Sequence, residues 1–417
     1  MKIEENLYAY SYAGRFLLHN VLRSTWILID EEELQLIQQH RYTELSRSTQ
    51  NKLNIFQLLL KEPLEIEKPE RTTPKTAYLV LTHQCNLKCV YCYAEADLTK
   101  EYPDSLTFLE WIDVLNQLKD AGVGKVIFTG GEIGLNHDSL KYIDYANRIG
   151  LTVGLITNGT ILGTKKNAAF LAKRCAAITV SLDSIDPKAN DENRGRGCYA
   201  IAMRGIRHLL KLGYKNISAN AIVTNQNLPF VDETIEFFKE NGISYKIGGF
   251  SELGRANTAE ISLTAEERKM IEWKEKNTER SPLMQPFTIK DSCGLGIGEF
   301  AINPIGEIYA CKLLETDEYR LGNIRRKRVA DIFNEASIQL IDSQNVENLK
   351  ACRNCSFRYL CGGGCRAHHY YKTNDRQGVE KEECELLKET IKYQMYRACT
   401  YQETGGTIDE IESRTSL

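Results

Sequence analysis

The 417-residue sequence has little net charge and no long apolar segment. Its 53 basic and 56 acidic residues leave a formal charge of −3, so the composition gives no drive toward nucleic acid or anionic lipid. We find no apolar run of about 18 residues, as a membrane-spanning helix would need, and no signal-peptide pattern at the start. The short basic run 325–328 predicts a solvated turn. These absences predict a soluble, cytoplasmic protein that binds neither nucleic acid nor membrane.

Internal repeats and low-complexity tracts are also missing, but cysteine is abundant. The chain has 13 cysteines. A reducing cytosol disfavours structural disulfides, so these thiols predict metal-binding or redox roles. The length is sufficient for two or three domains with a large core.

Residues 1–75 read as a small α+β unit. Two apolar segments predict strands and two amphipathic segments predict helices. The predicted strands are 14–20 and 24–30, and the predicted helices are 31–40 and 50–62. A run with Pro69 and Pro74 follows, and it has the composition of a linker because proline biases its neighbours toward extended backbone. We therefore expect a domain boundary near residue 75.

From residue 76 to about 285, apolar strands alternate with helices. The predicted strands are 76–82, 125–130, 151–157, 176–182, 216–224 and 245–250. Strands that alternate with helices predict a parallel sheet, and six such units predict an α/β fold with a partial (β/α)6 TIM-like barrel. In that architecture chemistry takes place at the C-terminal ends of the strands.

Two helices of this region have clear signals. In segment 105–122 one helical face is apolar before the stop at Gly122, and its predicted members are Phe108, Ile112, Leu115 and Leu118. Segment 232–242 predicts a helix with Asp232 as its N-cap and Gly242 past its end.

After residue 285 the pattern changes to glycine, cysteine and short strands. Segment 299–311 predicts strands, whereas segments near 329–337 and 383–397 predict helices. We expect residues 286–400 to form a third domain and the polar residues 401–417 to form a flexible tail.

Three cysteines lie within eight residues at the end of the first predicted barrel strand. Cys85, Cys89 and Cys92 follow a C-x3-C-x2-C spacing. Three thiolates in one loop can each reach one iron of a cubane cluster and leave the fourth iron without a protein ligand, which makes that position reactive. The alternative is a zinc knuckle that borrows His83 as its fourth ligand, but the flanking strand and Tyr91 fit it less well.

With Tyr91 in the aromatic position before the third cysteine, this loop resembles that of the radical S-adenosylmethionine (SAM) superfamily. The resemblance implies a 4Fe-4S cluster whose open iron is chelated by SAM. One electron from the cluster then cleaves SAM to a 5′-deoxyadenosyl radical, which abstracts hydrogen from the substrate.

Further motifs match the superfamily in the expected order along the chain. TGGE ends the second strand, TNG the third and SLDS the fourth, and GRA follows the sixth. Ile133 is a departure, since many relatives carry proline there. The resemblance implies that the SAM contacts are made by Tyr91, Gly130, Gly131, Glu132, Asn158, Ser181, Asp183 and Arg255. For Ser181 and Asp183, which would contact ribose, a purely structural role at the strand end is the alternative.

Seven later cysteines form an ordered set that resembles the SPASM extension of radical enzymes that modify peptides and proteins. Seven thiolates suit two auxiliary 4Fe-4S clusters better than zinc sites. The resemblance assigns Cys352, Cys355, Cys361 and Cys384 to one cluster and Cys293, Cys311 and Cys365 to the other. The second set is one ligand short, so that water, a carboxylate or a substrate sulfur would complete it. Cys175, Cys198 and Cys399 lie outside both patterns, and Cys175 reads as a core residue.

The function implied is a peptide maturase that abstracts hydrogen from a ribosomally synthesised precursor peptide and installs a crosslink, with a thioether as the first choice. Residues 1–75 would bind the precursor's leader as an added strand, in the manner of a small winged-helix element. A structural cap on the barrel is the alternative for this unit. The expected partners are the precursor peptide and an electron donor such as flavodoxin or ferredoxin.

Rival functions remain open from the sequence. A carbon–carbon crosslinking cyclase would use the same cofactors. A sulfatase-maturating enzyme would form formylglycine, but such enzymes usually lack an N-terminal unit and fill both auxiliary clusters. A non-enzymatic iron–sulfur electron carrier or a zinc-scaffolded binding module would not need the TGGE and SLDS motifs.

Overall fold

The computed structural model describes residues 1–65, 73–276 and 283–404. The chain forms two compact units, which are described separately. The first comprises Met1–Glu70, Lys276–Cys293 and Ser343–Leu417, and the second comprises Arg71–Glu275 and Gly294–Asp342. Neither unit is continuous in sequence, unlike the linear division expected above. Pro69 of the expected linker and the expected tail beyond residue 404 lie outside the described residues.

An antiparallel sheet begins the first unit, in the order β1-β2-β3. Its strands are β1 (Leu7–Tyr12), β2 (Arg15–Asn20) and β3 (Thr25–Ile29). β2 and β3 are the two predicted strands, whereas β1 was not predicted. Ala13 and Gly14 join β1 to β2 with φ of 47° and 74°, as a two-residue hairpin turn requires.

Two helices follow the sheet. α1 (Glu31–Gln38) begins with a capping box, in which Asp30 accepts from the Glu33 N–H and the Glu33 side chain accepts from the Asp30 N–H. α2 (Arg47–Ile55) starts earlier and ends earlier than predicted, so the prediction of a helix over 50–62 is wrong.

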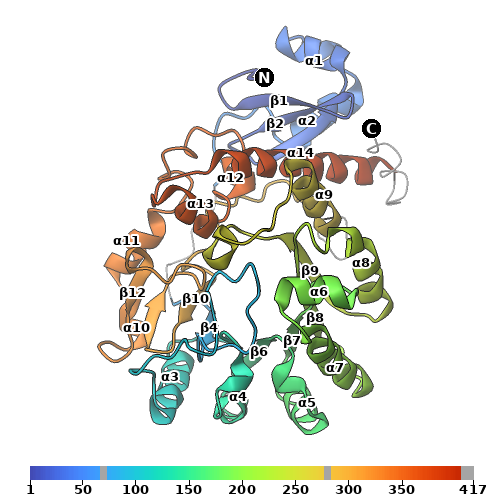
Figure 1. Cartoon of the computed structure of the whole chain (residues 1–417). Coiled ribbons are helices and arrows are strands. Elements are labelled where there is room, and N and C mark those ends of the chain that lie inside the picture. The colour runs from blue at the N-terminus through green and yellow to red at the C-terminus, as the bar shows by residue number, and fades with distance from the viewer. Residues whose placement is uncertain (66–72, 277–282, 405–417) are drawn as a thin grey trace. The chain divides into compact units, whose positions relative to one another are not determined.

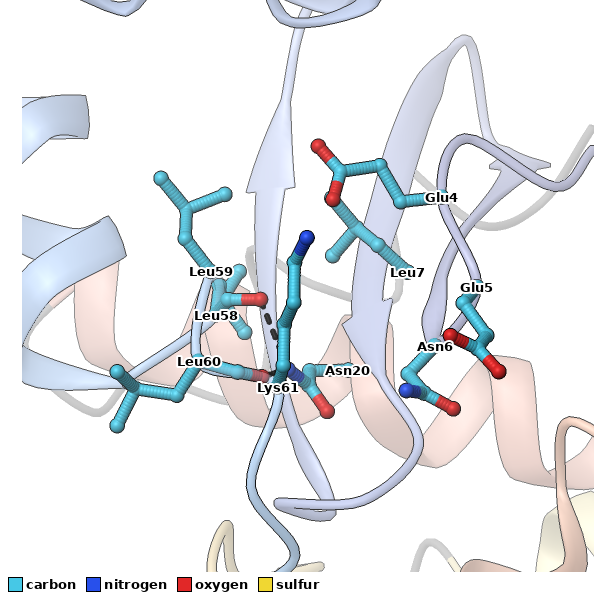
Figure 2. Close-up of a pocket in the computed structure, with 9 residues that line it drawn as sticks. All are labelled: Glu4, Glu5, Asn6, Leu7, Asn20, Leu58, Leu59, Leu60 and Lys61. Carbon is cyan, nitrogen blue, oxygen red and sulfur yellow. Dashed lines mark hydrogen bonds between the residues drawn. The ribbon is translucent and has the colours of Figure 1, made fainter.

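Hydrogen bonds from Asn20 explain why the chain leaves the helical path after α2. The Asn20 amide nitrogen donates to the carbonyl oxygens of Leu58 and Leu60, at 2.8 Å each, and holds this segment beside β2 in a non-helical path (Figure 2). The segment lines a small open pocket of about 40 Å³, together with Glu4, Leu7 and Lys61. Such a volume holds a few water molecules and excludes a peptide or a cofactor.

Both faces of the first sheet are covered. One face packs on α1 and α2 through an apolar core that includes Leu18, Ile27 and Ile37. The other packs on the cysteine-rich C-terminal segment through a core of Leu17, Trp26, Leu28, Phe357, Leu360, Ile391, Met395, Tyr396 and Ala398. The helices of that segment are α12 (Arg358–Cys361), α13 (Arg366–Thr373) and α14 (Lys381–Thr404). The N-terminal and C-terminal parts of the chain therefore share one folded unit.

The second unit is built on a nine-stranded sheet in the order β12-β11-β10-β4-β5-β6-β7-β8-β9. The six predicted strands are confirmed and pair in parallel in chain order. They are β4 (Thr76–Val80), β5 (Lys125–Thr129), β6 (Thr152–Thr157), β7 (Ala177–Ser181), β8 (Ile217–Val223) and β9 (Ser244–Gly249). These parallel strands and their helices are the predicted partial barrel.

Three later strands extend this sheet, and the sequence did not predict their position. β10 (Glu299–Ile302) pairs in parallel with β4, and β11 (Glu307–Tyr309) and β12 (Arg320–Asn323) then add antiparallel. Residues expected to belong to the third domain thus continue the barrel sheet.

Helices cover the outer face of the curved sheet (Figure 1). Those that contribute to the core with the sheet are α3 (Phe108–Asp120), α4 (Ser139–Arg148), α5 (Lys165–Ala172), α7 (Cys198–Lys211), α8 (Val231–Glu240), α9 (Ala265–Lys276) and α10 (Val329–Ile332). The unit also contains α6 (Pro187–Arg194) and α11 (Glu335–Asp342). Short 3₁₀ turns lie at Tyr42–Glu44, Ile133–Leu135, Thr160–Leu162, Leu228–Phe230, Gly254–Asn257 and Asp317–Tyr319.

Three details of these helices correct the predictions. The buried face of α3 is centred on Trp111, Leu115 and Leu118, whereas Phe108 at the first turn is 38% exposed. Asp232 is not a cap, because α8 begins one residue earlier and Asp232 instead pairs with Lys274. The helix predicted near 329–337 is divided into α10 and α11.

No helix in the described ranges combines the length and apolar character that crossing a bilayer requires.

Trp26 offers a test of the shared core of the first unit. It is 3% exposed, and its indole N–H donates to the Met395 carbonyl at 3.1 Å. Trp26→Ala is expected to lower the free energy of unfolding of this unit by about 3–5 kcal/mol, because it leaves a large cavity. Hydrogen exchange monitored by mass spectrometry should show faster exchange in both β1–β3 and α14. Ile55→Ala, at a 66% exposed position, is the control, and unchanged exchange in α14 would contradict the shared core.

Candidate functional site

The predicted SAM-site residues gather at one edge of the second unit. The cysteine loop follows β4, Gly130 to Glu132 follow β5, Asn158 follows β6, and Ser181 ends β7. Because these strands are parallel, their C-terminal ends meet at the same edge of the sheet. Local strand patterning together with parallel pairing is therefore sufficient to bring these motifs together.

The cysteine loop is packed in a small apolar cluster. Cys85 and Cys89 are buried and Cys92 is half-buried. Leu87 and Ala96 belong to the same cluster, as does Cys198 from the start of α7, which no sequence pattern assigned to the site. Asn190 donates its side-chain amide to Cys198 Sγ at 3.1 Å. The site thus contains a fourth, fixed thiol beside the predicted three.

Arg255 of the GRA motif is bound to the cysteine loop by three hydrogen bonds. Its Nε donates to the Cys89 carbonyl at 2.9 Å, its Nη1 to the Ala96 carbonyl at 3.0 Å, and its main-chain N–H to the Cys92 carbonyl at 3.1 Å. Gly254 makes this approach possible, since a Cβ there would lie 2.5 Å from the Cys92 oxygen. The remaining nitrogen, Nη2, is buried without a partner among the described residues. An unpaired buried donor is costly, so it marks a place for an acceptor.

The glycines of TGGE are required by the protein's own backbone. A Cβ at Gly130 would lie 2.5 Å from the Thr82 carbonyl oxygen, and one at Gly131 would lie 2.3 Å from that of Gln84. The Gly131 N–H donates to Thr82 and the Glu132 N–H to Gln84, at 2.8 Å each. These residues therefore position the segment that leads into Cys85.

Glu132 is buried and its carboxylate is fully engaged. It accepts from Thr157 Oγ1 at 2.8 Å, from the Asn158 N–H at 2.8 Å and from the Gly134 N–H at 3.0 Å. Burial raises its pKa, and these hydrogen bonds oppose that shift by stabilising the carboxylate. Glu132 thus joins the ends of β5 and β6.

A buried ion pair lies behind the loop. Arg194 Nη1 donates to Asp183 Oδ1 at 3.0 Å and to the Tyr91 hydroxyl at 2.6 Å, and Tyr91 donates in turn to Asp183 Oδ2. The Ile222 N–H also donates to Asp183, at 3.1 Å. Burial raises the pKa of Tyr91 well above its usual value. The sequence reasoning missed Arg194, although a basic residue on the helix after SLDS was a usable signal.

Two further residues predicted to contact SAM, Asn158 and Ser181, differ in how many hydrogen bonds they make to other residues of the protein. Asn158 donates to Asn86 at 2.9 Å and accepts from the Thr160 N–H at 2.9 Å. Ser181 is half-exposed, and its hydroxyl makes no hydrogen bond within the part of the chain that the structure describes. The Ser181 hydroxyl is thus accessible to a ligand, whereas the Asp183 carboxylate is hydrogen-bonded to Arg194.

The thiols of the loop suit metal binding. Burial raises the pKa of Cys85 to about 11 and also raises that of Cys89. Buried thiols ionise when a bound metal supplies compensating charge. In the described ranges no three His, Cys, Asp or Glu side chains converge on a single metal position. A four-iron cluster takes its thiolates at different irons and therefore spreads its ligands more widely than one ion does.

Four of the predicted auxiliary ligands gather in the first unit. Cys355, Cys361 and Cys384 all act electrostatically on Cys352, whose pKa burial raises to about 11. The predicted complete set is therefore brought together. Within it the N–H groups of Gly363 and Gly364 donate to Cys361, and Gly362, Gly363 and Gly364 all adopt positive φ, of 69°, 84° and 66°. Glycine is needed there because this conformation is strained for other residues.

Arg366 adds a second buried donor without a partner. Its side chain is 1% exposed, its other nitrogens donate to Gln344 and to the carbonyls of Arg376 and Gly378, and its Nη1 has no partner among the described residues. Its charge lowers the pKa of Cys352. A guanidinium beside four thiols is suited to an anionic cluster, and the sequence reasoning did not single it out.

The third predicted cysteine set is divided between the units. Cys293 and Cys365 are exposed in the first unit, and Cys311 is half-buried in the second. The segment after Cys311 is fixed to the loop before Cys85 by a 3.1 Å contact between His83 Nε2 and Glu315 Oε2. Burial lowers the pKa of the adjacent Lys312, the charges of Glu299 and Cys311 oppose that shift, and the charge of Lys246 adds to it.

Two family models match the chain. The model of the radical SAM superfamily matches residues 79–245, and that of the SPASM iron–sulfur cluster-binding domain matches residues 293–356.

Curated relatives are similar over most of their length. The mycofactocin maturase MftC of Mycolicibacterium smegmatis is 26% identical, over 72% of this chain and 80% of its own. The antilisterial bacteriocin subtilosin biosynthesis protein AlbA of Bacillus subtilis is 26% identical, over 76% and 74%. An AdoMet-dependent heme synthase of Oleidesulfovibrio alaskensis is also 26% identical, over 72% and 84%.

Solved structures share the fold. Streptococcus suis SuiB bound to its precursor peptide SuiA has a TM-score of 0.60 at 19% identity, covering 92% of this chain and 99% of that one. Native anSMEcpe with bound AdoMet has a TM-score of 0.61 at 19% identity, covering 78% and 99%. The two family models, together with the curated relatives, identify the chain as a radical SAM enzyme with a C-terminal SPASM domain, which uses SAM and iron–sulfur clusters.

Proposed function

We propose that this enzyme is a maturase of ribosomally synthesised peptides that installs a crosslink in its precursor. The observation that carries the proposal is the N-terminal three-stranded sheet, which shares a core with the cysteine-rich segment in one folded unit. SuiB, which has been solved with a precursor peptide, resembles this chain over 92% of its length, including most of that unit. MftC and AlbA are named for the maturation or biosynthesis of such products.

The sheet has one edge, at β3, without a further strand partner among the described residues. The residues of β3 are buried, so a leader would have to displace the segments that cover this edge. On the β1 side, Met1 and Lys2 already bridge to Tyr8 and Ala9. On the other side β3 ends the sheet. An extended peptide can add to such an edge through main-chain hydrogen bonds. We propose β3 as the strand that the leader joins.

In the second unit, Cys85, Cys89 and Cys92 are proposed to hold the cluster that binds SAM. Ser181 offers a hydroxyl and Arg255 an unpaired nitrogen to the bound cofactor, while Glu132, Asp183 and Arg194 keep the surrounding loops in place. When bound, the cluster and SAM supply a carbon-centred radical that removes a hydrogen atom from the substrate. The protein's part is to hold the target hydrogen close and to exclude water. Flavodoxin or ferredoxin is the proposed electron donor.

A thioether is the crosslink that we propose. The seven cysteines of the C-terminal pattern are one thiolate short of two full sets, and a substrate cysteine could supply the missing sulfur. A carbon–carbon crosslink and sulfatase maturation are the competing outcomes.

The direct experiment is anaerobic co-expression with a short cysteine-containing peptide encoded next to the gene. A crosslink would appear by mass spectrometry as the loss of two hydrogen atoms, and trapping of free thiols would show whether cysteine is consumed. Conversion of a sulfatase peptide to its formylglycine form, with no change in the neighbouring peptide, would contradict the proposal.

The loop cysteines provide the first mutational test. Cys85→Ala, Cys89→Ala and Cys92→Ala should each abolish 5′-deoxyadenosine formation and remove about four of about twelve irons per chain. Cys175→Ala is the control, because Cys175 lies in the hydrophobic core of the second unit. Chromatography of reaction products and iron analysis after reconstitution give both readouts. Normal cofactor cleavage in a loop variant would refute the assignment.

Gly131 tests the backbone packing that positions the loop. Gly131→Ala places a Cβ 2.3 Å from the Gln84 oxygen, where backbone must move, whereas Gly124 has no atom within 4 Å of the corresponding position. We expect Gly131→Ala to reduce SAM binding at least about tenfold, which corresponds to about 1.4 kcal/mol. Gly124→Ala should bind normally. Equilibrium binding of SAM to the reconstituted protein measures both, and equal affinities would show that the loop tolerates displacement.

Cys384 tests the auxiliary set separately. Cys384→Ala should perturb one auxiliary cluster in Mössbauer or electron paramagnetic resonance spectra while SAM cleavage continues at a reduced rate. The loop cluster keeps all three of its own ligands, which is the reason for the partial effect. A variant with wild-type iron content and spectra would count against the assignment of Cys384.

A further inference from the structure

The sheet of the second unit has two different faces. Residues that point toward the helices, such as Ala77, Leu79 and Phe128, are buried in the core. The alternate residues point to the inner face and are half-exposed or exposed, among them Tyr78 on β4, Lys246 on β9 and Glu299 on β10. An inner face that keeps polar side chains partly accessible can receive a ligand.

Lys312 lies on this inner face. Its Nζ stands 4.0 Å from the ring centroid of Tyr78, and the Tyr78 hydroxyl is hydrogen-bonded to Glu299. Lys246 is near enough for its charge to act on Lys312, although β9 and β4 lie five positions apart in the strand order. The curvature of the sheet therefore brings Lys246 of β9 near Lys312, whose ammonium group lies over Tyr78 of β4.

Neither ammonium group has an ion-pair partner within 4.0 Å in the described ranges. The carboxylate of Glu299, which is hydrogen-bonded to Tyr78, lies near enough for its charge to act on Lys312, as does Cys311 when ionised. Two lysines and one glutamate leave one excess positive charge. Such a group is complementary to a single negative charge, as on a carboxylate.

The segment that carries Lys312 is fixed. Leu314 is fully buried, its N–H donates to the Cys311 carbonyl at 3.0 Å, and Glu315 bonds His83 at 3.1 Å. His83 lies two residues before Cys85. Lys312 is thus held in a defined position on a segment tied directly to the cysteine loop, as a substrate-binding residue must be.

We propose that Lys312, assisted by Lys246, binds a carboxylate of the substrate peptide at the inner face of the barrel. The proposal rests on the proposed function and adds to it a substrate class: a peptide with an acidic side chain, or its own C-terminal carboxylate, close to the modified residue.

The test uses the reconstituted full-length enzyme under anaerobic conditions. Lysines are labelled briefly with acetic anhydride, and the labelling rate of each lysine is read by mass spectrometry. The probes are three N-acetylated tripeptides: a C-terminal amide with a central glutamate, the same amide with glutamine, and a tripeptide with uncharged side chains and a free C-terminal carboxylate. Lys239, exposed on α8, is the internal control.

The glutamate peptide or the free-acid peptide should protect Lys312, with the labelling rate falling to about one tenth at ten times the dissociation constant. Which of the two protects identifies the source of the carboxylate. Lys239 should label at a constant rate, and Lys312→Met should lose the peptide affinity that Lys312→Arg largely keeps. Equal protection by the glutamine peptide, or no protection by any probe, overturns the proposal.

Two further measurements separate the possible failures. Protection of Lys312 by SAM alone, with none by the peptides, would place Lys312 in the cofactor site and overturn the proposal. Dithionite-driven formation of 5′-deoxyadenosine in the same preparation shows whether the radical chemistry is intact. Failure of peptide crosslinking with preserved protection would reject the proposed function and leave the carboxylate site standing.

Discussion

The candidate active site depends on one constraint, which is the fixed path of the backbone around Cys85, Cys89 and Cys92. Main-chain carbonyls of this loop accept hydrogen bonds from Arg255, and the segment before it is in contact with Gly130 and Gly131. A loop with three thiols has many alternative conformations, and these contacts remove most of them before any cluster binds. The entropic cost of ordering the loop is therefore met during folding, so it does not reduce the free energy of cluster binding.

The polar residues of the familiar motifs consequently divide into two kinds. Glu132 and Asp183 have their oxygens occupied by donors from the protein, and they hold the surrounding loops in place. Ser181 and the free nitrogen of Arg255 retain unsatisfied hydrogen-bonding capacity. A resemblance in sequence does not distinguish residues that position the loops from residues with unused hydrogen-bonding capacity, because both occur in the same short motifs.

In the first unit, shared packing links the N-terminal sheet to the cysteine-rich segment. β1–β3 contribute one face to a core with α1 and α2 and the other to a core with α12 and α14, so that Trp26 contacts the helix that begins beside Cys384. Assembly of the four-cysteine set and stability of the N-terminal sheet are therefore coupled through shared packing.

Much of the fold was determined by the sequence itself. The six barrel strands and the position of the cysteine loop after the first of them follow from apolar patterning and local spacing, which act over a few residues. The grouping of Cys352, Cys355, Cys361 and Cys384 was implied by the resemblance to SPASM domains and not by spacing alone. Tertiary structure alone decided that β10 joins β4, that α2 ends at Ile55, that Trp111 replaces Phe108 in the core, and that Arg194 and Cys198 lie beside the cysteine loop. Each of those outcomes depends on a contact between residues distant in sequence, where hydrogen-bond direction and packing override local preference.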